Sequence, residues 1–138
     1  MVAKKILQEV LKDKEKMISD RHFLHTHPET GFDLSETKAY VRQQLEAMGY
    51  TPISCGKAGV IAIAGGKKPG KVFLIRGDMD ALPIQEEAEI DYPSKNGNMH
   101  ACGHDMHTTM LLEAARILKK HEEELEGTVK LMFQPAEE

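Results

Sequence analysis

The sequence is poor in cysteine and has no long apolar run. Its 138 residues include two cysteines, Cys55 and Cys102, which lie far apart and form no Cys-x-x-Cys pair. A disulfide framework or a redox dithiol is therefore not expected. The N-terminal stretch carries a charged residue every few positions, unlike the apolar core of a signal peptide or a membrane span. We expect a cytoplasmic protein with no membrane partner.

Basic charge is also scarce. The 18 Lys and Arg residues are outnumbered by 22 Asp and Glu residues, which gives a net charge of −4 with no basic block. Nucleic acid is therefore not expected as a partner. The hydrophobic fraction of 41% and the 11 glycines are usual for a globular protein. A chain of this length buries about two thirds of its unfolded surface, so it needs no disulfide or structural metal to fold as a single domain.

Apolar residues recur at helical spacing in three segments. The pattern predicts one amphipathic helix over residues 2–25, a second over 33–48 and a third over 105–121. Asp33 and Glu36 have the spacing of a capping box, which predicts the start of the second helix.

Short apolar runs predict three strands, at residues 59–64, 72–75 and 128–133. The first two flank the turn-like segment 65–70, so we expect them to be adjacent strands. Residues 77–101 show no sustained period and predict a long irregular segment, which in a compact domain is usually functional. The order strand, long loop, helix, strand is typical of a crossover unit and predicts an α/β sheet with flanking helices.

The segment Met99-His-Ala-Cys-Gly-His-Asp-Met-His107 is the strongest candidate for a chemical site. It offers one thiol, three imidazoles and a carboxylate, the ligands that zinc and similar metals prefer. The glycine between Cys102 and His104 would let the two side chains converge just before a helix. The alternative is a polar loop in which Asp105 caps the helix and the histidines are solvated. We favour a metal site.

Two pairs of acidic residues follow apolar strands. Asp78 and Asp80 lie in Arg76-Gly-Asp-Met-Asp-Ala-Leu-Pro83, where carboxylates could bind a metal or orient a ligating histidine, although a plain turn has the same composition. Glu137 and Glu138 follow the last strand. One could bind metal while the other serves as general base, whereas an ordinary charged terminus is the alternative.

Histidines outside these motifs are harder to interpret. In the segment 21–27, which holds three histidines, we favour an ordinary helix end whose imidazoles meet carbonyl groups or water. The roles of His25, His100 and His107 stay open between ligand, support and surface.

Together the motifs resemble a known family. The sequence contains, in order, Arg21-x-x-Leu-His-x-x-Pro-Glu29, Arg76-x-Asp-Met-Asp-Ala-Leu-Pro83, Met99-His-Ala-Cys-Gly-His-Asp-x-His107 and Phe133-Gln-Pro-Ala-Glu-Glu138. This order resembles the N-terminal portion of the amidohydrolase branch of the aminoacylase-type metallopeptidases. That branch includes hippurate hydrolases, N-acetyldiaminopimelate deacetylases and hydrolases of auxin–amino acid conjugates. The resemblance implies a zinc-peptidase-like catalytic domain.

The resemblance also implies roles for individual residues. Cys102, His104 and Glu138 would be metal ligands, Glu137 the general base, and Asp78 a carboxylate that helps hold the site. Enzymes of this branch use two divalent metal ions, such as Zn, Mn, Co or Ni, to cleave the amide bond of small N-acyl amino acids. A metal polarises the acyl carbonyl, and the general base passes a proton from water to the leaving amine.

Family members are longer than this chain, and their other metal-binding histidines and their smaller substrate and dimerisation domain lie further downstream. We therefore expect residues 1–138 to be the N-terminal portion of a metallohydrolase catalytic domain, with little activity alone. The alternative is a non-catalytic truncated relative that binds at most one metal and pairs with another chain. We also expect an open edge along strand 128–133, through which the chain could form a homo-oligomer.

Overall fold

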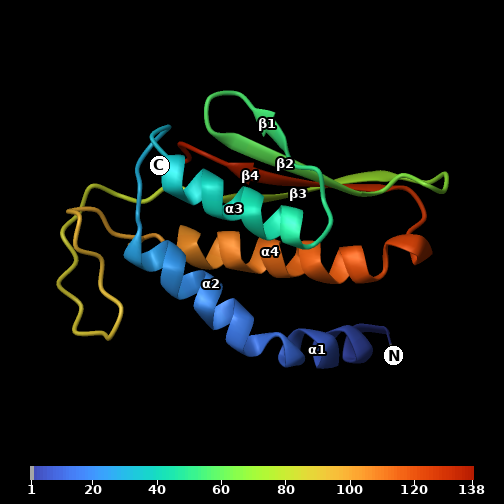
Figure 1. Ribbon diagram of the computed structural model, residues 1–138, viewed down its shortest axis with the longest axis horizontal. Helices are drawn as coiled ribbons and strands as arrows, with labels where there is room; N and C mark the ends of the chain where they lie inside the picture. The colour runs from blue at the N-terminus through green and yellow to red at the C-terminus, as the bar shows by residue number, and fades with distance from the viewer. Residues whose placement is uncertain (1) are drawn as a thin grey trace.

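A four-stranded sheet with helices along one face forms the body of the protein (Figure 1). The computed structural model describes residues 2–138. Its helices are α1 (Val2–Lys12), α2 (Lys14–Thr26), α3 (Ser35–Ala47), α4 (His104–Lys120) and the short 3-10 helix η1 (Glu122–Glu124). Its strands are β1 (Ile53–Cys55), β2 (Gly59–Gly65), β3 (Val72–Asp78) and β4 (Thr128–Gln134). The expected α/β sheet with flanking helices is confirmed.

The strand order β1-β2-β4-β3 places β4 inside the sheet. β3 and β4 are parallel and are joined through α4, which is the crossover unit that the sequence predicted. β2 runs antiparallel to β4. The expectation that the strands at 59–64 and 72–75 are adjacent is wrong, because β4 lies between them.

The connection from β2 to β3 explains this difference. It must span two strand spacings, about 10 Å, and the chain from Gly65 to Val72 is long enough to do so while crossing the start of β4. At the crossing, the backbone N–H of Gly66 donates to the carbonyl of Gly127 at 2.7 Å. Gly127 has φ +93°, and a Cβ there would lie 2.1 Å from the carbonyl oxygen of Lys71. The composition of this segment suits a hairpin turn and a crossing equally well.

The hydrophobic core lies between the sheet and the helices α3 and α4 (Figure 1). Side chains alternate between the two faces of a strand, so Val60, Ala62 and Ala64 of β2 are buried on the helix side, as are Leu131 and Phe133 of β4. Their partners are buried apolar side chains of the two helices: Val41, Leu45, Leu111, Leu112 and Ala115. α2 packs against α4 and so forms a further layer.

The single helix expected over residues 2–25 is wrong, because the chain breaks at Asp13 between α1 and α2. The Asp13 carboxylate pairs with Lys120 at the end of α4, at 2.7 Å. α1 buries no side chain fully, and Leu7 and Leu11 remain more than half exposed. A contact with a residue 107 positions away along the chain lies at this break. Among the described residues, no helix is both long and apolar enough to cross a membrane.

The capping box expected at the start of the second helix is also wrong. α3 begins at Ser35, and its N-cap residue Leu34 makes no side-chain cap. Glu29, from the preceding loop, takes that role: its carboxylate accepts the N–H groups of Glu36 at 3.0 Å and Thr37 at 2.7 Å. A carboxylate at this position satisfies free N–H groups and complements the helix dipole.

The open edge of the sheet is not where the sequence placed it. β4 has a neighbour on each side, so the edge expected along residues 128–133 is wrong. β3 is an edge strand instead. It leaves four consecutive apolar side chains between 42% and 63% exposed: Val72, Phe73, Leu74 and Ile75.

Candidate metal centre

The candidate site lies at the carboxyl ends of the two parallel strands. In the parallel register Asp78, at the end of β3, is paired with Gln134, at the end of β4. α4 begins beside them at His104, after Gly103 turns the chain with φ +90°. Ligand sites in α/β proteins commonly form at this edge of the sheet. The topology therefore brings the three sequence motifs at 76–83, 99–107 and 133–138 together.

His104 stands at the centre of the site with one fixed nitrogen and one free nitrogen. It is 2% exposed, and its Nδ1 lies 2.8 Å from the carbonyl oxygen of Asp80, so Nδ1 donates. In the neutral ring, which is the form that binds a metal, Nε2 then carries the lone pair. Nε2 faces three carboxylates, with Asp78 at 3.6 Å, Glu137 at 3.5 Å and Glu138 at 3.7 Å.

The three residues proposed from the sequence as metal ligands converge. One donor atom from each of Cys102, His104 and Glu138 lies within 4.8 Å of the other two. The backbone N–H of Glu138 donates to Asp80 at 3.1 Å, which holds the end of the chain against the β3 exit. A thiol, an imidazole and a carboxylate make a donor set that suits zinc and other borderline divalent metals. The side chains present therefore fit such an ion.

A second group, Asp78, His104 and His107, also has donor atoms within 4.8 Å of one another. It shares His104 with the first group, and that imidazole has a single free lone pair. Asp78 is moreover already engaged, because its Oδ1 lies 2.5 Å from Nδ1 of His107. The two groups are therefore alternative positions around one imidazole nitrogen.

The pKa values of Asp78 and Cys102 are shifted in opposite directions. Burial alone would raise the pKa of the Asp78 carboxyl, but the hydrogen bond from His107 and the charges of the nearby imidazoles outweigh burial and lower it. Hydrogen bonding to Glu138 raises the pKa of the Cys102 thiol, and the other carboxylates add to this effect. A bound divalent cation would lower the pKa of the Cys102 thiol instead, because a coordinated thiol loses its proton.

Sequence reasoning missed a buried ion cluster behind the site. His25, expected to meet carbonyl groups or water, lies instead between Asp105 at 2.7 Å and Glu86 at 2.8 Å. His27 does meet a carbonyl, that of Phe23, at 2.8 Å. No local signal could reveal the His25 contacts, because its partners lie 61 and 80 positions away along the chain.

His100 is buried next to this cluster. Neither of its ring nitrogens has a hydrogen-bond partner among the described residues. Burial lowers the pKa of His100 to about 4, so the ring is neutral at neutral pH. Of the roles left open for His100, a surface role is excluded, because the ring is buried and uncharged.

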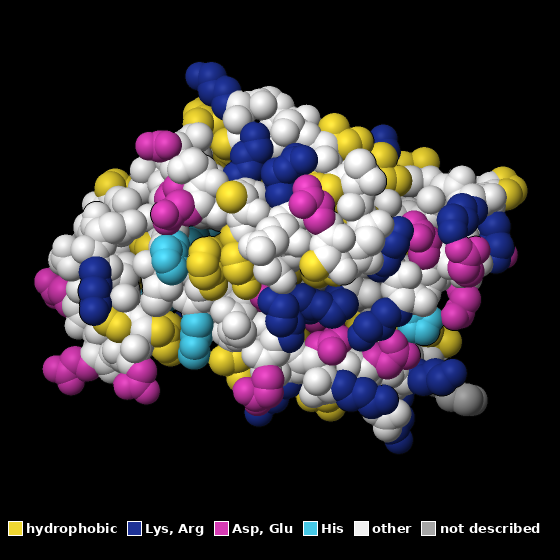
Figure 2. Space-filling view, viewed as in Figure 1, with side chains coloured by type: hydrophobic (Ala, Val, Ile, Leu, Met, Phe, Trp, Pro, Cys, Tyr) yellow, Lys and Arg dark blue, Asp and Glu magenta, His cyan; other side chains and the backbone are white. Residues whose placement is uncertain are grey.

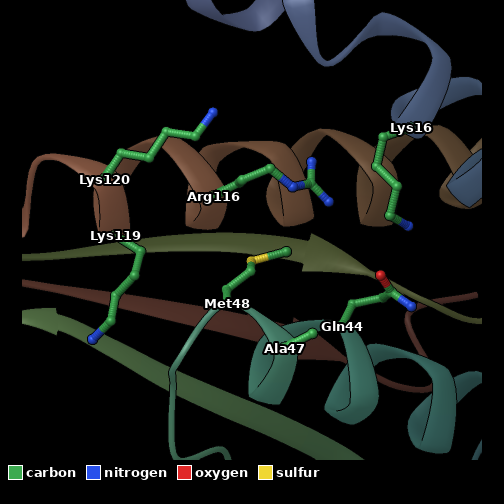
Figure 3. A pocket seen from close by; sticks show the side chains of 7 residues that line it. All are labelled: Lys16, Gln44, Ala47, Met48, Arg116, Lys119 and Lys120. Carbon is green, nitrogen blue, oxygen red and sulfur yellow. The ribbon is translucent and has the colours of Figure 1, made fainter.

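A separate basic cleft lies between α2, α3 and α4, with a volume of about 470 Å³ (Figure 3). Figure 2 shows Lys and Arg side chains gathered near the middle of the side of the molecule that faces the viewer. Each of the four basic residues of the cleft has an acidic partner: Lys16 with Asp20, Arg116 with Asp20 and Glu113, Lys119 with Glu122, and Lys120 with Asp13. The cleft therefore has little uncompensated charge, and it contains none of the residues of the metal centre.

Comparison with known proteins agrees with this geometry. Residues 74–138, which include every residue of the candidate metal centre, match the model of peptidase family M20/M25/M40. The segment that carries the candidate metal centre thus has the signature of this family. The family resemblance inferred from the four motifs is confirmed.

Similar proteins include enzymes named for amide hydrolysis. The chain is 44% identical to the N-acyl-L-amino acid amidohydrolase of Geobacillus stearothermophilus over 137 residues, which cover 98% of this chain and 36% of that protein. It is 50% identical to the IAA-amino acid hydrolase ILR1-like 5 of Arabidopsis thaliana over 127 residues, which cover 88% of this chain and 28% of that protein. The chain thus spans about a third of the length of such relatives.

Two solved structures have the same fold. A putative aminohydrolase from methicillin-resistant Staphylococcus aureus matches with a TM-score of 0.93 and 37% identity, over 100% of this chain and 37% of that one. The Bacillus subtilis YXEP protein, described as a dinuclear metal-binding peptidase, matches with a TM-score of 0.84 and 43% identity, over 88% of this chain and 35% of that one.

Proposed function

We propose that this chain forms part of the active site of a metal-dependent amidohydrolase that cleaves the amide bond of N-acyl amino acids. The observation that carries the proposal is the convergence of Cys102, His104 and Glu138 at the carboxyl end of the sheet, with Glu137 beside them. Relatives named as amidohydrolases of N-acyl amino acids and of IAA–amino acid conjugates support this substrate class. A cytoplasmic location remains part of the proposal.

Cys102, His104 and Glu138 would hold a divalent metal such as Zn, Mn, Co or Ni. When bound, the metal would polarise the acyl carbonyl and make water more acidic. His104 offers one free nitrogen, and both metal-capable groups among the described residues depend on it. We therefore infer that residues 2–138 hold a single ion, and that the second ion of a two-metal site needs donors from elsewhere.

Glu137 is the residue placed to move the proton. Its Oε2 lies 3.5 Å from Nε2 of His104, and about a third of its side chain is exposed. A carboxylate there can accept a proton from the attacking water and donate it to the leaving amine. Asp78, whose pKa is lowered, remains ionised next to His104 and His107 and would help hold the site.

The second candidate function is that of a non-catalytic relative that binds at most one metal and acts by pairing with another chain. Two observations favour it. Both groups of possible metal ligands among the described residues share the one imidazole of His104, and β3 has an exposed apolar edge on which another strand could pair.

A chimera separates the two functions. Residues 1–138 would replace the matching segment of the Geobacillus stearothermophilus amidohydrolase, and hydrolysis of N-acetyl and N-benzoyl amino acids would be measured. We expect turnover by the chimera and a loss of about 10²-fold to 10⁴-fold in kcat for Glu137→Gln, with unchanged metal content. Glu123→Gln, at a largely exposed glutamate, is the matched control and should be fully active. The isolated chain should show no turnover above its own Glu137→Gln variant.

Two results would contradict the enzymatic proposal. One is a folded, metal-loaded chimera without activity. The other is a Glu137→Gln chimera that is as active as the unsubstituted chimera.

A further inference from the structure

The imidazole of His25 lies between two buried carboxylates that come from distant parts of the chain. Nδ1 is 2.7 Å from Oδ2 of Asp105, and Nε2 is 2.8 Å from Oε1 of Glu86. The exposed fractions are 4% for His25, 8% for Glu86 and 1% for Asp105. Three elements meet at this ring: the end of α2, the irregular segment 79–103 and the first turn of α4.

The chemistry of the contacts sets the direction of the hydrogen bonds at the ring. An ionised carboxylate only accepts hydrogen bonds, so each ring nitrogen of His25 that carries a proton donates to the carboxylate it faces. Burial would raise the pKa of Glu86, but the hydrogen bonds from His25 and from the N–H of Ser94 outweigh burial and lower it. Arg21 adds a cation, with its Nε 3.3 Å from Asp105. Both buried carboxylates of the cluster therefore contact His25, and Asp105 also contacts Arg21.

The segment tied by His25 carries one of the proposed metal ligands, Cys102. Residues 79–103 contain no helix and no regular strand, and Leu82 and Met99 form their one internal bridge among the described residues. Side chains must therefore hold most of this segment in place. Glu86 lies in it, and Cys102 near its end. Asp105 directly follows the ligand His104.

We propose that His25 is a positioning residue for the metal centre. It locks the segment 79–103 onto the first turn of α4 and thereby fixes where Cys102 stands relative to His104. This inference rests on the proposed function, because it takes these two residues as metal ligands. Partners of this kind behind metal ligands typically change metal affinity by about 10-fold to 100-fold when they are replaced.

Co²⁺ is a suitable probe for the test, because its visible absorption reports both the geometry of the site and bonding to a thiolate. The intact chain would be titrated with Co²⁺ and compared with His25→Gln, whose amide can donate to only one of the two carboxylates. His27→Gln is the matched control, since His27 lies on the same turn and contacts the carbonyl of Phe23 rather than segment 79–103.

We expect His25→Gln to weaken Co²⁺ binding about 10-fold to 100-fold and to change the absorption spectrum of the saturated site. The His27→Gln control should match the unsubstituted chain in both readouts. A purely structural role would lower the unfolding temperature without altering the spectrum at saturation. If His25→Gln does not fold, Glu86→Gln replaces it, because that variant keeps the His25 to Asp105 contact and should show the same two effects.

The outcomes distinguish this inference from the proposed function. Failure of the unsubstituted chain to bind Co²⁺ would overturn the metal centre and this inference together. Tight binding by the unsubstituted chain, with the same affinity and spectrum in the folded variant, would overturn the role of His25 and leave the metal centre intact.

Discussion

His104 can offer a metal only one nitrogen, because the other donates to the carbonyl of Asp80. At the scale of single residues, this contact selects which neighbours can share an ion with the ring. Asp78 and His107 form a hydrogen-bonded pair beside the ring, and Cys102 and Glu138 are the other proposed donors near it. The site therefore depends on a backbone carbonyl as much as on the side chains of the motif.

The grouping of the candidate metal-site residues could be predicted from the sequence for a physical reason. Cys102 and His104 lie two positions apart in one loop, and the glutamates directly follow a strand, so local spacing was sufficient to group them. The buried contacts of His25 could not be found in this way, since they depend on how α2 packs against α4. The contact of His107 with Asp78 likewise depends on how α4 packs against β3.

Gly127 provides a test of the crossing between β2 and β3. Gly127→Ala should destabilise the fold, because a Cβ would lie 2.1 Å from the carbonyl oxygen of Lys71 in addition to the strain of φ +93°. Gly56→Ala is the matched control, with φ +59° and no neighbour within 4 Å of its Cβ. In urea unfolding, we expect Gly56→Ala to cost about 1–2 kcal/mol and Gly127→Ala about 1–3 kcal/mol more. Equal losses would contradict the close approach.

At the scale of elements, helix ends are controlled from outside the helices. The start of α3 is capped by Glu29 rather than by Asp33, so a local capping pattern pointed to the wrong residue. The break at Asp13 likewise lies at a contact with Lys120 on another helix. Periodicity therefore predicted where helices form, whereas packing decided where they begin and end.

The cap predicts a difference between two acidic residues. Glu29→Ala should lower the free energy of unfolding by about 1–2 kcal/mol, the usual effect of removing a helix cap. Asp33→Ala should change it by less than about 0.5 kcal/mol, as for a surface substitution that removes no cap. Chemical denaturation of both variants measures the difference. A larger loss of unfolding free energy for Asp33→Ala than for Glu29→Ala would instead support a capping box at Asp33 and Glu36.

His121 links α1 to the end of α4 and makes this contact sensitive to pH. Hydrogen bonds to Glu124 and Glu9 raise the pKa of His121 above its usual value. The charged ring therefore stabilises the docking of α1 fully below the unfolded pKa, about 6.5. That stabilisation is lost as the pH rises through the raised folded pKa.

Hydrogen exchange of the α1 amides, corrected for the intrinsic pH dependence, tests this expectation. Protection should fall as the pH rises through that window, and His121→Gln should remove the trend. Added salt should weaken it, because the pair is near the surface. A pH trend that persists unchanged in His121→Gln would assign the effect to another group.

At the scale of the whole molecule, the unusual feature is the exposed edge of β3. An edge strand with four apolar residues and free backbone groups favours pairing with another chain. We expect association of the purified chain to increase with concentration in sedimentation velocity, and Leu74→Lys to reduce it. Phe32→Lys, at an apolar residue that is similarly exposed but lies in a loop, should have no effect. A monomer at every concentration would contradict this prediction.

The fold class could be predicted because strand, loop, helix and strand follow one another in the order of a crossover unit. The strand order could not, because residues 65–70 suit either a hairpin turn or a path over β4. That ambiguity also misplaced the open edge, which the sequence assigned to β4 and the structure assigns to β3. Long-range pairing, rather than local composition, decides both features.

The most direct test of the account is the metal content of the purified chain, measured by elemental analysis after loading with Zn²⁺ and desalting. The unsubstituted chain should retain about one ion, the number that a single thiol, imidazole and carboxylate set can hold. Cys102→Ser should lose most of it, whereas Cys55→Ser, at the exposed cysteine of β1, should retain it. Equal metal in the Cys102→Ser and Cys55→Ser variants, or none in the unsubstituted chain, would contradict the metal centre.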